Sequence, residues 1–183
     1  MAPRFTLIQC RNIDDPVRGE ELLCFSERLG VPAENIRAVD LLRDPMDSSL
    51  WTGVDAVLVG GSGDYSVLDP EPQIRRFIDV LVEIVDRGFP MFASCFGFQA
   101  LAMGLGGEVI RDPANAEVGT YTLSTLPEAS DDPLFSALPA SFDAQLGHTD
   151  RASALSDRAI PLARSAAVPY QALKVKGAPV YAT

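Results

Sequence analysis

The sequence of 183 residues has one histidine, three cysteines and one tryptophan, and it contains no long apolar run. A membrane-spanning helix needs about 18 or more apolar residues in succession, so we predict no membrane partner. The first residues also lack the apolar run of a secretory signal. The cysteines, Cys10, Cys24 and Cys95, are odd in number and show no Cys-x-x-Cys or metal spacing, which argues against a disulfide framework. We therefore expect a cytoplasmic protein without a metal ion.

Basic residues are scarce as well. The sequence has 15 Lys and Arg against 25 Asp and Glu, a formal net charge of −10. Nucleic-acid binders need a basic surface and anionic membranes attract one, so we predict that neither is a partner. Hydrophobic residues make up 47% of the sequence, enough for one sizeable core. With no linker or repeat, we expect a single domain over residues 1–183.

The first half of the sequence alternates apolar runs of strand length with stretches of helical periodicity. The run Val54–Val59 is rich in β-branched residues, as expected of a parallel strand covered on both faces. This alternation predicts a three-layer, doubly wound α/β fold: a mostly parallel sheet with helices on both faces. We predict strands at 5–9, 36–42, 54–59 and 90–92, and helices after Pro16, from Pro72 to Val85 and from Phe98 onward.

On the first of these helices, Val17, Leu22, Phe25 and Leu29 can share one apolar face. We interpret Cys10 and Cys24 as packing residues, because unpaired cysteines are usually buried. After Gly106 the apolar runs become shorter, and loops rich in Pro, Asp and Ser separate them. This pattern predicts some antiparallel strands, so that the sheet as a whole is mixed. The runs lie at 108–111, 118–123, 142–146, 160–164, 170–175 and 180–182.

The segment Phe89–Met103 is the strongest candidate for chemistry. A short apolar run precedes Cys95, and helical periodicity begins at Phe98. A sharp strand-to-helix turn holds its middle residue under strain, with the side chain projecting, and it needs small neighbours such as Ala93 and Gly97. The amino end of the following helix would lower the pKa of the Cys95 thiol and favour the thiolate. The residues alone leave a second interpretation open, in which Cys95 is a small buried side chain without a chemical role.

A glycine-rich loop, Gly60–Asp64, directly follows the run Val54–Val59. Glycine permits a close approach of backbone to a ligand, so these amides could point at a substrate oxygen. An ordinary loop is the alternative, and a phosphate-binding loop is excluded because no Gly-Lys-Ser/Thr follows. Ligands of doubly wound sheets bind beyond the carboxyl ends of the strands. We therefore expect Gly60–Gly61 and Cys95 to lie side by side.

Four segments resemble the class I glutamine amidotransferases, the triad type with a cysteine nucleophile. In chain order they are Val57–Ser62, Ala93–Gln99, Glu117–Gly119 and Gly147–Asp150. The four segments span most of the sequence. The Cys-x-Gly-x-Gln pattern in the second segment is specific for the family, and each of the other three segments is weak evidence when taken alone. Ala93 stands where the family usually has glycine, and it is small enough for the turn. The resemblance implies a flavodoxin-like form of the predicted fold and no cofactor.

The resemblance assigns a role to each matching residue. Cys95 would attack the side-chain amide of glutamine and form a γ-glutamyl thioester. The amides of Gly61 and Phe96 would form the oxyanion hole. The substrate-binding residues would be Gln99 and the backbone of His148, Thr149 and Asp150. From the residues alone, Gln99 can equally be a solvated helix residue, and His148 a structural histidine at the end of a strand.

The sequence departs from the family at the general base. In the family this base is the His of a His-Pro-Glu segment after a strand that resembles Val180–Thr183, and no such segment is present. His148 matches a different motif, so we do not assign it as the base. We expect the sequence to be a shortened one whose longer form continues with His, and with Glu two residues later. The 183 residues alone are then expected to sustain no glutamine hydrolysis.

The resemblance implies an enzyme, a glutaminase-type domain that binds glutamine or a γ-glutamyl compound and releases ammonia. Two alternatives stay open: a γ-glutamyl peptide hydrolase with the same nucleophile, and a non-catalytic binding or regulatory protein of this fold. No synthase domain is fused within the sequence, so ammonia transfer would need a synthase partner chain. The residues do not identify the ammonia acceptor.

Overall fold

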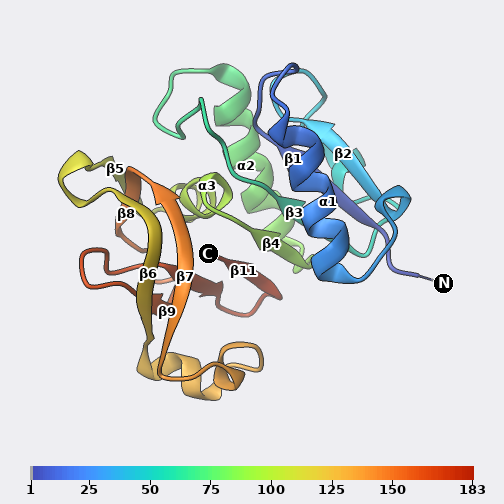
Figure 1. Cartoon of the computed structure of the whole chain (residues 1–183). Coiled ribbons are helices and arrows are strands. Elements are labelled where there is room, and N and C mark those ends of the chain that lie inside the picture. The colour runs from blue at the N-terminus through green and yellow to red at the C-terminus, as the bar shows by residue number, and fades with distance from the viewer. Residues whose placement is uncertain (1) are drawn as a thin grey trace.

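A mixed sheet forms the centre of the molecule (Figure 1). The computed structural model describes residues 2–183, and within them the sheet has nine strands in the order β2-β1-β3-β4-β11-β10-β9-β6-β7. These strands are β1 (Phe5–Gln9), β2 (Ile36–Asp40), β3 (Ala56–Val59), β4 (Met91–Ala93), β6 (Glu117–Thr125), β7 (Ser141–His148), β9 (Ala159–Arg164), β10 (Ala172–Val175) and β11 (Val180–Ala182). The helices are α1 (Val17–Leu29), α2 (Pro72–Asp86) and α3 (Phe96–Gly104), and short 3₁₀ turns lie at Ala33–Asn35, Ser48–Leu50, Pro113–Asn115, Pro127–Asp131 and Phe135–Ala137.

One half of the sheet is parallel. β2, β1, β3, β4 and β11 all run in the same direction. Alternate residues of β1 face opposite sides, because side chains alternate along a strand. Leu7 packs in a cluster with Leu22 and Phe25 of α1, and Ile8 packs in the larger core with α2 and α3. Helices therefore cover both faces, and the predicted three-layer α/β fold is confirmed.

The helices α2 and α3 close the larger core. α2 presents seven buried side chains, among them Phe77, at the helical spacing seen in the sequence. The ring of Phe77 stacks on that of Phe96, the first residue of α3, with 6.0 Å between centroids. This contact fixes the start of α3 against α2, and it is the start of α3 that carries the site.

The helix α1 is held much more loosely. None of its residues is buried, and only Leu22 and Phe25 pack partly against the sheet. The predicted four-residue apolar face is therefore wrong for Val17 and Leu29, which are 36% and 39% exposed. Cys24 is exposed too, so its interpretation as a packing residue is also wrong, whereas Cys10 is buried as predicted.

The other half of the sheet is antiparallel. β6 and β7 form a long hairpin that extends away from the helices (Figure 1). A separate two-stranded sheet pairs β5 (Glu108–Arg111) with β8 (Asp150–Ala154). The sequence patterns did not reveal β8, because its residues DRASA lack an apolar run. Among residues 2–183, no helix has both the length and the apolar character needed to cross a membrane.

Candidate active site

Cys95 lies between β4 and α3, at the carboxyl edge of the parallel strands. Its backbone has φ 51° and ψ −100°, and among the described residues it alone combines a positive φ with a side chain. Such a conformation is strained, and it persists only where the surroundings hold it. Three backbone hydrogen bonds do so: Cys95 N–H donates to Thr183 O at 2.7 Å, Gly97 N–H to Ser94 O at 2.8 Å, and Gln99 N–H to Cys95 O at 3.1 Å. The predicted strand–Cys–helix turn is confirmed.

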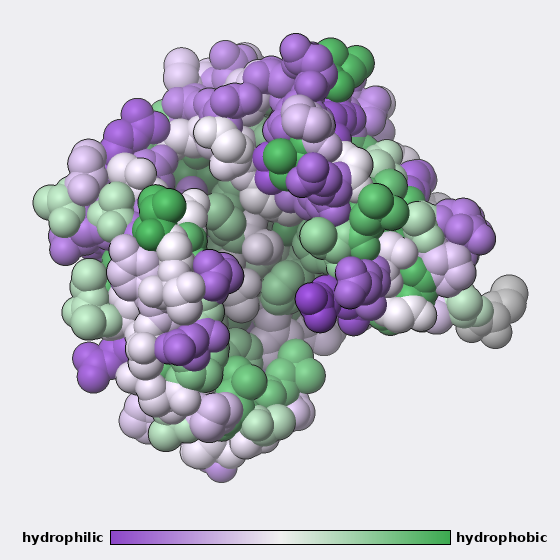
Figure 2. Space-filling model, viewed as in Figure 1, coloured by the Kyte–Doolittle hydropathy of each residue, from purple (hydrophilic) through white to green (hydrophobic). Residues whose placement is uncertain are grey.

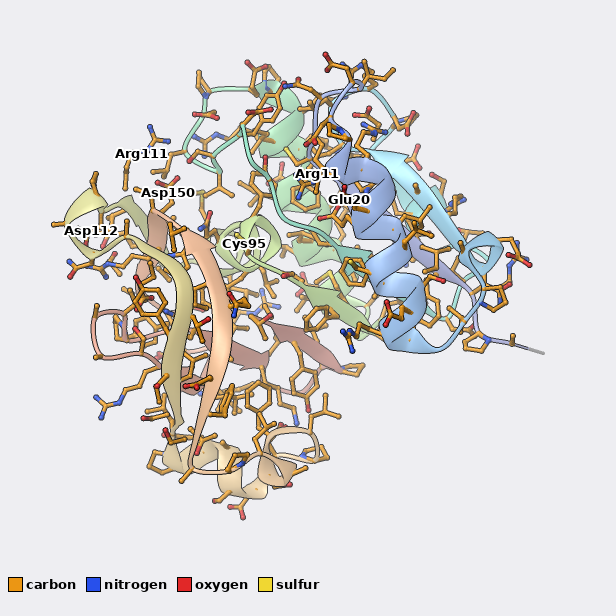
Figure 3. The ribbon with its side chains drawn as sticks, in the orientation of Figure 1. Arg11, Glu20, Cys95, Arg111, Asp112 and Asp150 are labelled. Carbon is orange, nitrogen blue, oxygen red and sulfur yellow. The ribbon has the colours of Figure 1, made fainter. Side chains whose placement is uncertain are left out.

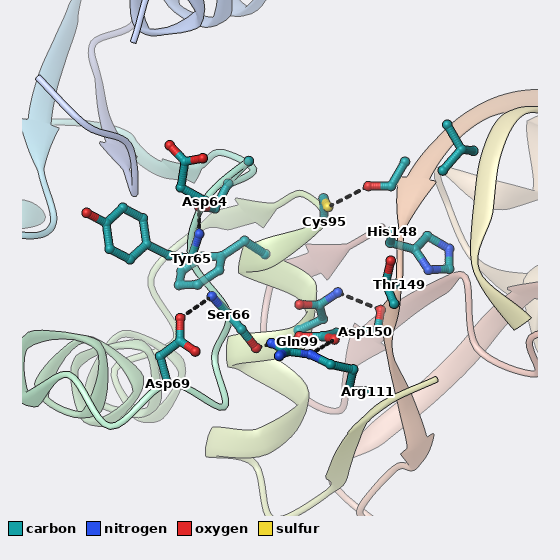
Figure 4. A pocket seen from close by; sticks show the side chains of 15 residues that line it. Asp64, Tyr65, Ser66, Asp69, Cys95, Gln99, Arg111, His148, Thr149 and Asp150 are labelled. Carbon is teal, nitrogen blue, oxygen red and sulfur yellow. Dashed lines mark hydrogen bonds and ion pairs between the residues drawn. The ribbon is translucent and has the colours of Figure 1, made fainter. Parts of the chain in front are cut away.

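The pKa of the Cys95 thiol differs from the expectation. Burial raises this pKa, and it outweighs the amide of Phe96, which donates to the sulfur, and the nearby charge of Arg11, both of which lower it. The prediction that the start of the helix would leave a lowered pKa is therefore wrong in direction. The thiol itself approaches the carbonyl oxygen of Gly147, with Sγ 4.0 Å from that oxygen (Figure 4).

A polar cavity of about 600 Å³ opens beside the thiol. It lies in the hollow between the β6–β7 hairpin and the parallel half (Figure 2). Among its lining residues are Cys95, Phe96, Gln99, His148, Thr149 and Asp150, so the structure brings these predicted site residues together. A second cavity, of about 320 Å³, also touches Cys95 and is lined largely by apolar side chains such as Leu123 and Phe142.

Gln99 and Asp150 connect α3 to the opposite wall of the polar cavity. The side-chain amide of Gln99 donates to the carbonyl oxygen of Asp150 at 2.8 Å, and Gln99 is 7% exposed. The Asp150 carboxylate in turn accepts from the hydroxyl of Ser66 and, at 3.1 Å, from Nε of Arg111 (Figure 4). Gln99 is thus a buried bracing residue rather than a solvated one. Ser66 and Arg111 were missed, because neither belongs to a motif and only the fold places them beside Asp150.

His148 is the last residue of β7, and its ring is engaged away from the thiol. Its Nε2 lies 3.3 Å from Oε2 of Glu117 and 3.5 Å from Nε2 of Gln171. The buried Nδ1 has no hydrogen-bond partner among the described residues. Glu117 also accepts from Gln171 at 2.5 Å and is 3% exposed. The histidine side chain therefore belongs to a buried polar cluster with Glu117 and Gln171.

Gly61 lies beside Cys95, as expected from the strand order. A Cβ placed on Gly61 would lie 3.7 Å from the Cβ of Cys95. Its amide, however, donates to Oε1 of Glu21 at 3.0 Å. The sequence offered no signal for this contact, because Glu21 is one of several acidic residues on an exposed helix.

The environments of the three cysteines predict an order of alkylation. Burial raises the pKa of Cys10 to about 12 and also raises that of Cys95, whereas Cys24 is exposed. Because the thiolate is the reactive form, a small neutral reagent such as iodoacetamide is expected to modify Cys24 first, Cys95 later and Cys10 last at pH 7.5. Peptide mapping over time measures this order. Modification of Cys95 before Cys24 would contradict it and restore the expectation of a lowered pKa.

Comparison with known proteins gives one family. Residues 32–183 match the family model "Glutamine amidotransferase class-I". The chain is 35% identical over 117 residues to the glutamine-hydrolyzing GMP synthase of Thermomicrobium roseum, covering 63% of this chain and 20% of that protein. It is 28% identical over 115 residues to one subunit of the glutamine-hydrolyzing GMP synthase of Methanocaldococcus jannaschii, covering 63% of this chain and 59% of that protein. The chain thus spans about a fifth of the length of the full GMP synthase.

Solved structures show the same fold. A glutamine amidotransferase from Thermotoga maritima has a TM-score of 0.78 at 18% identity, covering 100% of this chain and 75% of that one. A GMP synthase subunit from Thermoplasma acidophilum has a TM-score of 0.75 at 22% identity, covering 100% of this chain and 83% of that one.

The fold and site define an α/β protein with a cysteine held at a strained strand-to-helix turn. The chain belongs to the class I glutamine amidotransferase family, whose model matches most of its length. The resemblance read from the four sequence segments is confirmed.

Proposed function

We propose that the chain is a glutaminase-type domain in which Cys95 attacks the side-chain amide of glutamine to form a thioester, and that ammonia is released once a general acid–base group is supplied to the site. The observation that carries the proposal is the strained position of Cys95, which lines a polar cavity. In the first step the thiolate attacks the amide carbon, a C–S bond forms, and the C=O electron pair moves to the oxygen. Phe96 N–H, which donates to the sulfur at rest, would stabilise that oxyanion, and Gly61 N–H would do so once it is free.

The substrate in this proposal is glutamine or a γ-glutamyl compound, held by groups that line the polar cavity. Thr149 and the backbone of His148 and Asp150 would face its amino-acid end, and Gln99 would hold that wall in place through its bond to Asp150. The exposed guanidinium of Arg111 has one nitrogen paired with Asp150, which leaves its other nitrogens available to a carboxylate.

The names of the relatives favour a synthase partner that uses the ammonia. Both GMP synthases are described as glutamine-hydrolyzing, and one of the two matches is named as a subunit. We propose that this chain likewise supplies ammonia to a synthase domain or chain. The γ-glutamyl peptide hydrolase and the non-catalytic protein are less favoured, because the relatives named here are glutamine-hydrolyzing.

Labelling by a glutamine analogue tests the proposal. In a Cys24→Ala background, which removes the exposed thiol, a chloromethyl ketone analogue of glutamine is expected to add one equivalent, and none when Cys95→Ala is added, as read by intact mass. In the wild-type chain, peptide mapping is expected to find the label that glutamine prevents on Cys95 and the label that it does not prevent on the exposed Cys24. Protection by millimolar glutamine, but not by asparagine, would place the reaction in the polar cavity. A label that persists in the Cys24→Ala, Cys95→Ala chain, or a Cys95 label that glutamine does not prevent, would reject the proposal.

A further inference from the structure

One of the two amides of the predicted oxyanion hole, that of Gly61, already binds an anion in this structure. Glu21 accepts from Gly61 N–H at 3.0 Å and from Nη2 of Arg11 at 3.2 Å through the same oxygen, Oε1. Its other oxygen accepts from Nε2 of Gln9 at 2.9 Å. The Glu21 side chain is 10% exposed, so three donors bind a nearly buried carboxylate. These donors make a site whose chemistry suits any small oxyanion.

The carboxylate lies next to the nucleophile. A Cβ on Gly61 would lie 3.7 Å from Nη2 of Arg11 and 3.7 Å from the Cβ of Cys95, so the guanidinium and the thiol flank the same glycine. Figure 3 shows Arg11 on one side of Cys95 and Arg111 on the other. The charges reach the thiol, since Glu21 raises the pKa of Cys95 and Arg11 lowers it.

Attack by Cys95 would create a second anion at this place. The amide oxygen of the substrate gains a full negative charge as the C–S bond forms, and it needs the Gly61 amide as a donor. An ionised Glu21 on the same amide would withhold that donor and repel the new charge. The resting arrangement is therefore incompatible with a fully formed oxyanion hole.

We propose that Glu21 gates the oxyanion hole: its carboxylate holds the Gly61 amide at rest and leaves it when the substrate oxygen takes its place. Arg11 remains behind as the cation that faces the new oxyanion. The ion pair of Arg11 with Asp15 at 3.1 Å keeps the guanidinium in position, and the buried Nε of Arg11 has no partner among the described residues. Glu21 acts through the Gly61 amide, so it is a positioning residue; the identity of the substrate rests on the proposed function.

The loop and the helix both suit such an exchange. The helix α1 has no buried residue, so a small shift of the helix or a new rotamer of Glu21 disturbs little packing. Gly60 leaves room for the carboxylate, because a Cβ at this position would overlap the Glu21 carboxylate. Gly60→Ala therefore expels the carboxylate without removing its charge, and Glu21→Gln removes the charge without removing the side chain.

The test compares two reagents on Cys95. The chloromethyl ketone analogue of glutamine has a carbonyl that must be polarised, whereas iodoacetamide reacts by direct displacement. Rates are compared at the thiolate plateau of each pH profile, so that a changed thiol pKa does not enter. Glu21→Gln and Gly60→Ala are each expected to raise the rate with the ketone by about tenfold and to leave the rate with iodoacetamide within about twofold. Glu20→Gln, which removes a charge from the exposed neighbour on α1, is the matched control and is expected to change neither rate.

A second variant pair tests Arg11. In the Glu21→Gln variant the Arg11 guanidinium would face the oxyanion directly. Adding Arg11→Met removes this cation and is expected to lower the ketone rate about tenfold. An unchanged rate would mean that Arg11 only neutralises Glu21, and would overturn its part of the proposal. Ketone rates that are equal in wild type, Glu21→Gln, Gly60→Ala and Glu20→Gln would overturn the gate.

Amide hydrogen exchange separates the gate from the proposed function, because it needs no substrate. The Gly61 amide is expected to exchange at least about tenfold faster in Glu21→Ala than in wild type or Glu20→Ala. Unchanged exchange overturns the gate, whatever the ketone does. If the Gly61 amide exchanges faster in Glu21→Ala but the ketone labels no variant, the hydrogen bond from Gly61 to Glu21 is supported and only the glutaminase function is rejected.

Discussion

Glutamine incubated with the 183-residue chain is expected to yield no steady release of ammonia, although Cys95 reacts with the chloromethyl ketone analogue. Turnover needs a proton for the leaving ammonia and a base for the attacking water. The sole histidine of the sequence, His148, is committed to Glu117 and Gln171, with Nε2 at 3.3 Å and 3.5 Å from them. No described group other than backbone is hydrogen-bonded to the sulfur of Cys95. General acid–base catalysis contributes about 10²–10⁴-fold, so its absence leaves a rate near that of the blank.

An ammonia assay coupled to active-site titration with the ketone measures this rate per labelled site. Cys95→Ala provides the blank. Steady hydrolysis that is lost in both Cys95→Ala and His148→Ala would contradict the prediction and would show that His148 reaches the sulfur as the base. Thr122→Ser, a mild change at an exposed position of β6 that lines neither cavity beside Cys95, serves as the control for that result.

Gly97→Ala is expected to lower the free energy of unfolding by about 1–3 kcal/mol, as overpacked core positions do. The new Cβ would lie 2.7 Å from Cγ1 and 2.9 Å from Cβ of Val59, and 3.1 Å from Cβ of Ala93. Both neighbours belong to the central strands β3 and β4, which have little freedom to move. The start of α3 would therefore shift, and with it the strained turn at Cys95. The midpoint of urea unfolding at an unchanged m-value measures the loss.

Two further variants make this result specific. Gly19→Ala replaces a glycine of α1 whose added Cβ would have no neighbour within 4 Å, so it is expected to stabilise the chain by about 0.5–1 kcal/mol through helix propensity alone. Val59→Ala is expected to relieve part of the loss when combined with Gly97→Ala, because it removes the nearest clashing atom. A Gly97→Ala chain as stable as Gly19→Ala would show that α3 moves freely against the sheet.

The sequence by itself determined the order of the elements and the position of the thiol. All strands except β8, and the helix α2, followed from local patterns, because the spacing of apolar residues differs between a fully covered strand and an amphipathic helix. The turn at Cys95 was predictable for the same reason: small residues must flank a strained strand-to-helix junction, and Ala93 and Gly97 are small. Ligands of doubly wound sheets bind beyond the carboxyl ends of the strands, and this rule predicted that Gly61 lies near Cys95 without any knowledge of side-chain contacts.

Only the tertiary structure decided the electrostatics of the site. Burial by surrounding elements, not the start of α3, sets the direction of the Cys95 pKa shift. Glu21 reaches Gly61 across 40 positions of the chain, and Arg111 reaches Asp150 across 39. Neither partner lies in a motif, and each is one of many charged residues whose pattern fits a solvated surface. Contacts of this kind depend on which surfaces the sheet order brings together, and that order is a property of the whole fold rather than of any local stretch of sequence.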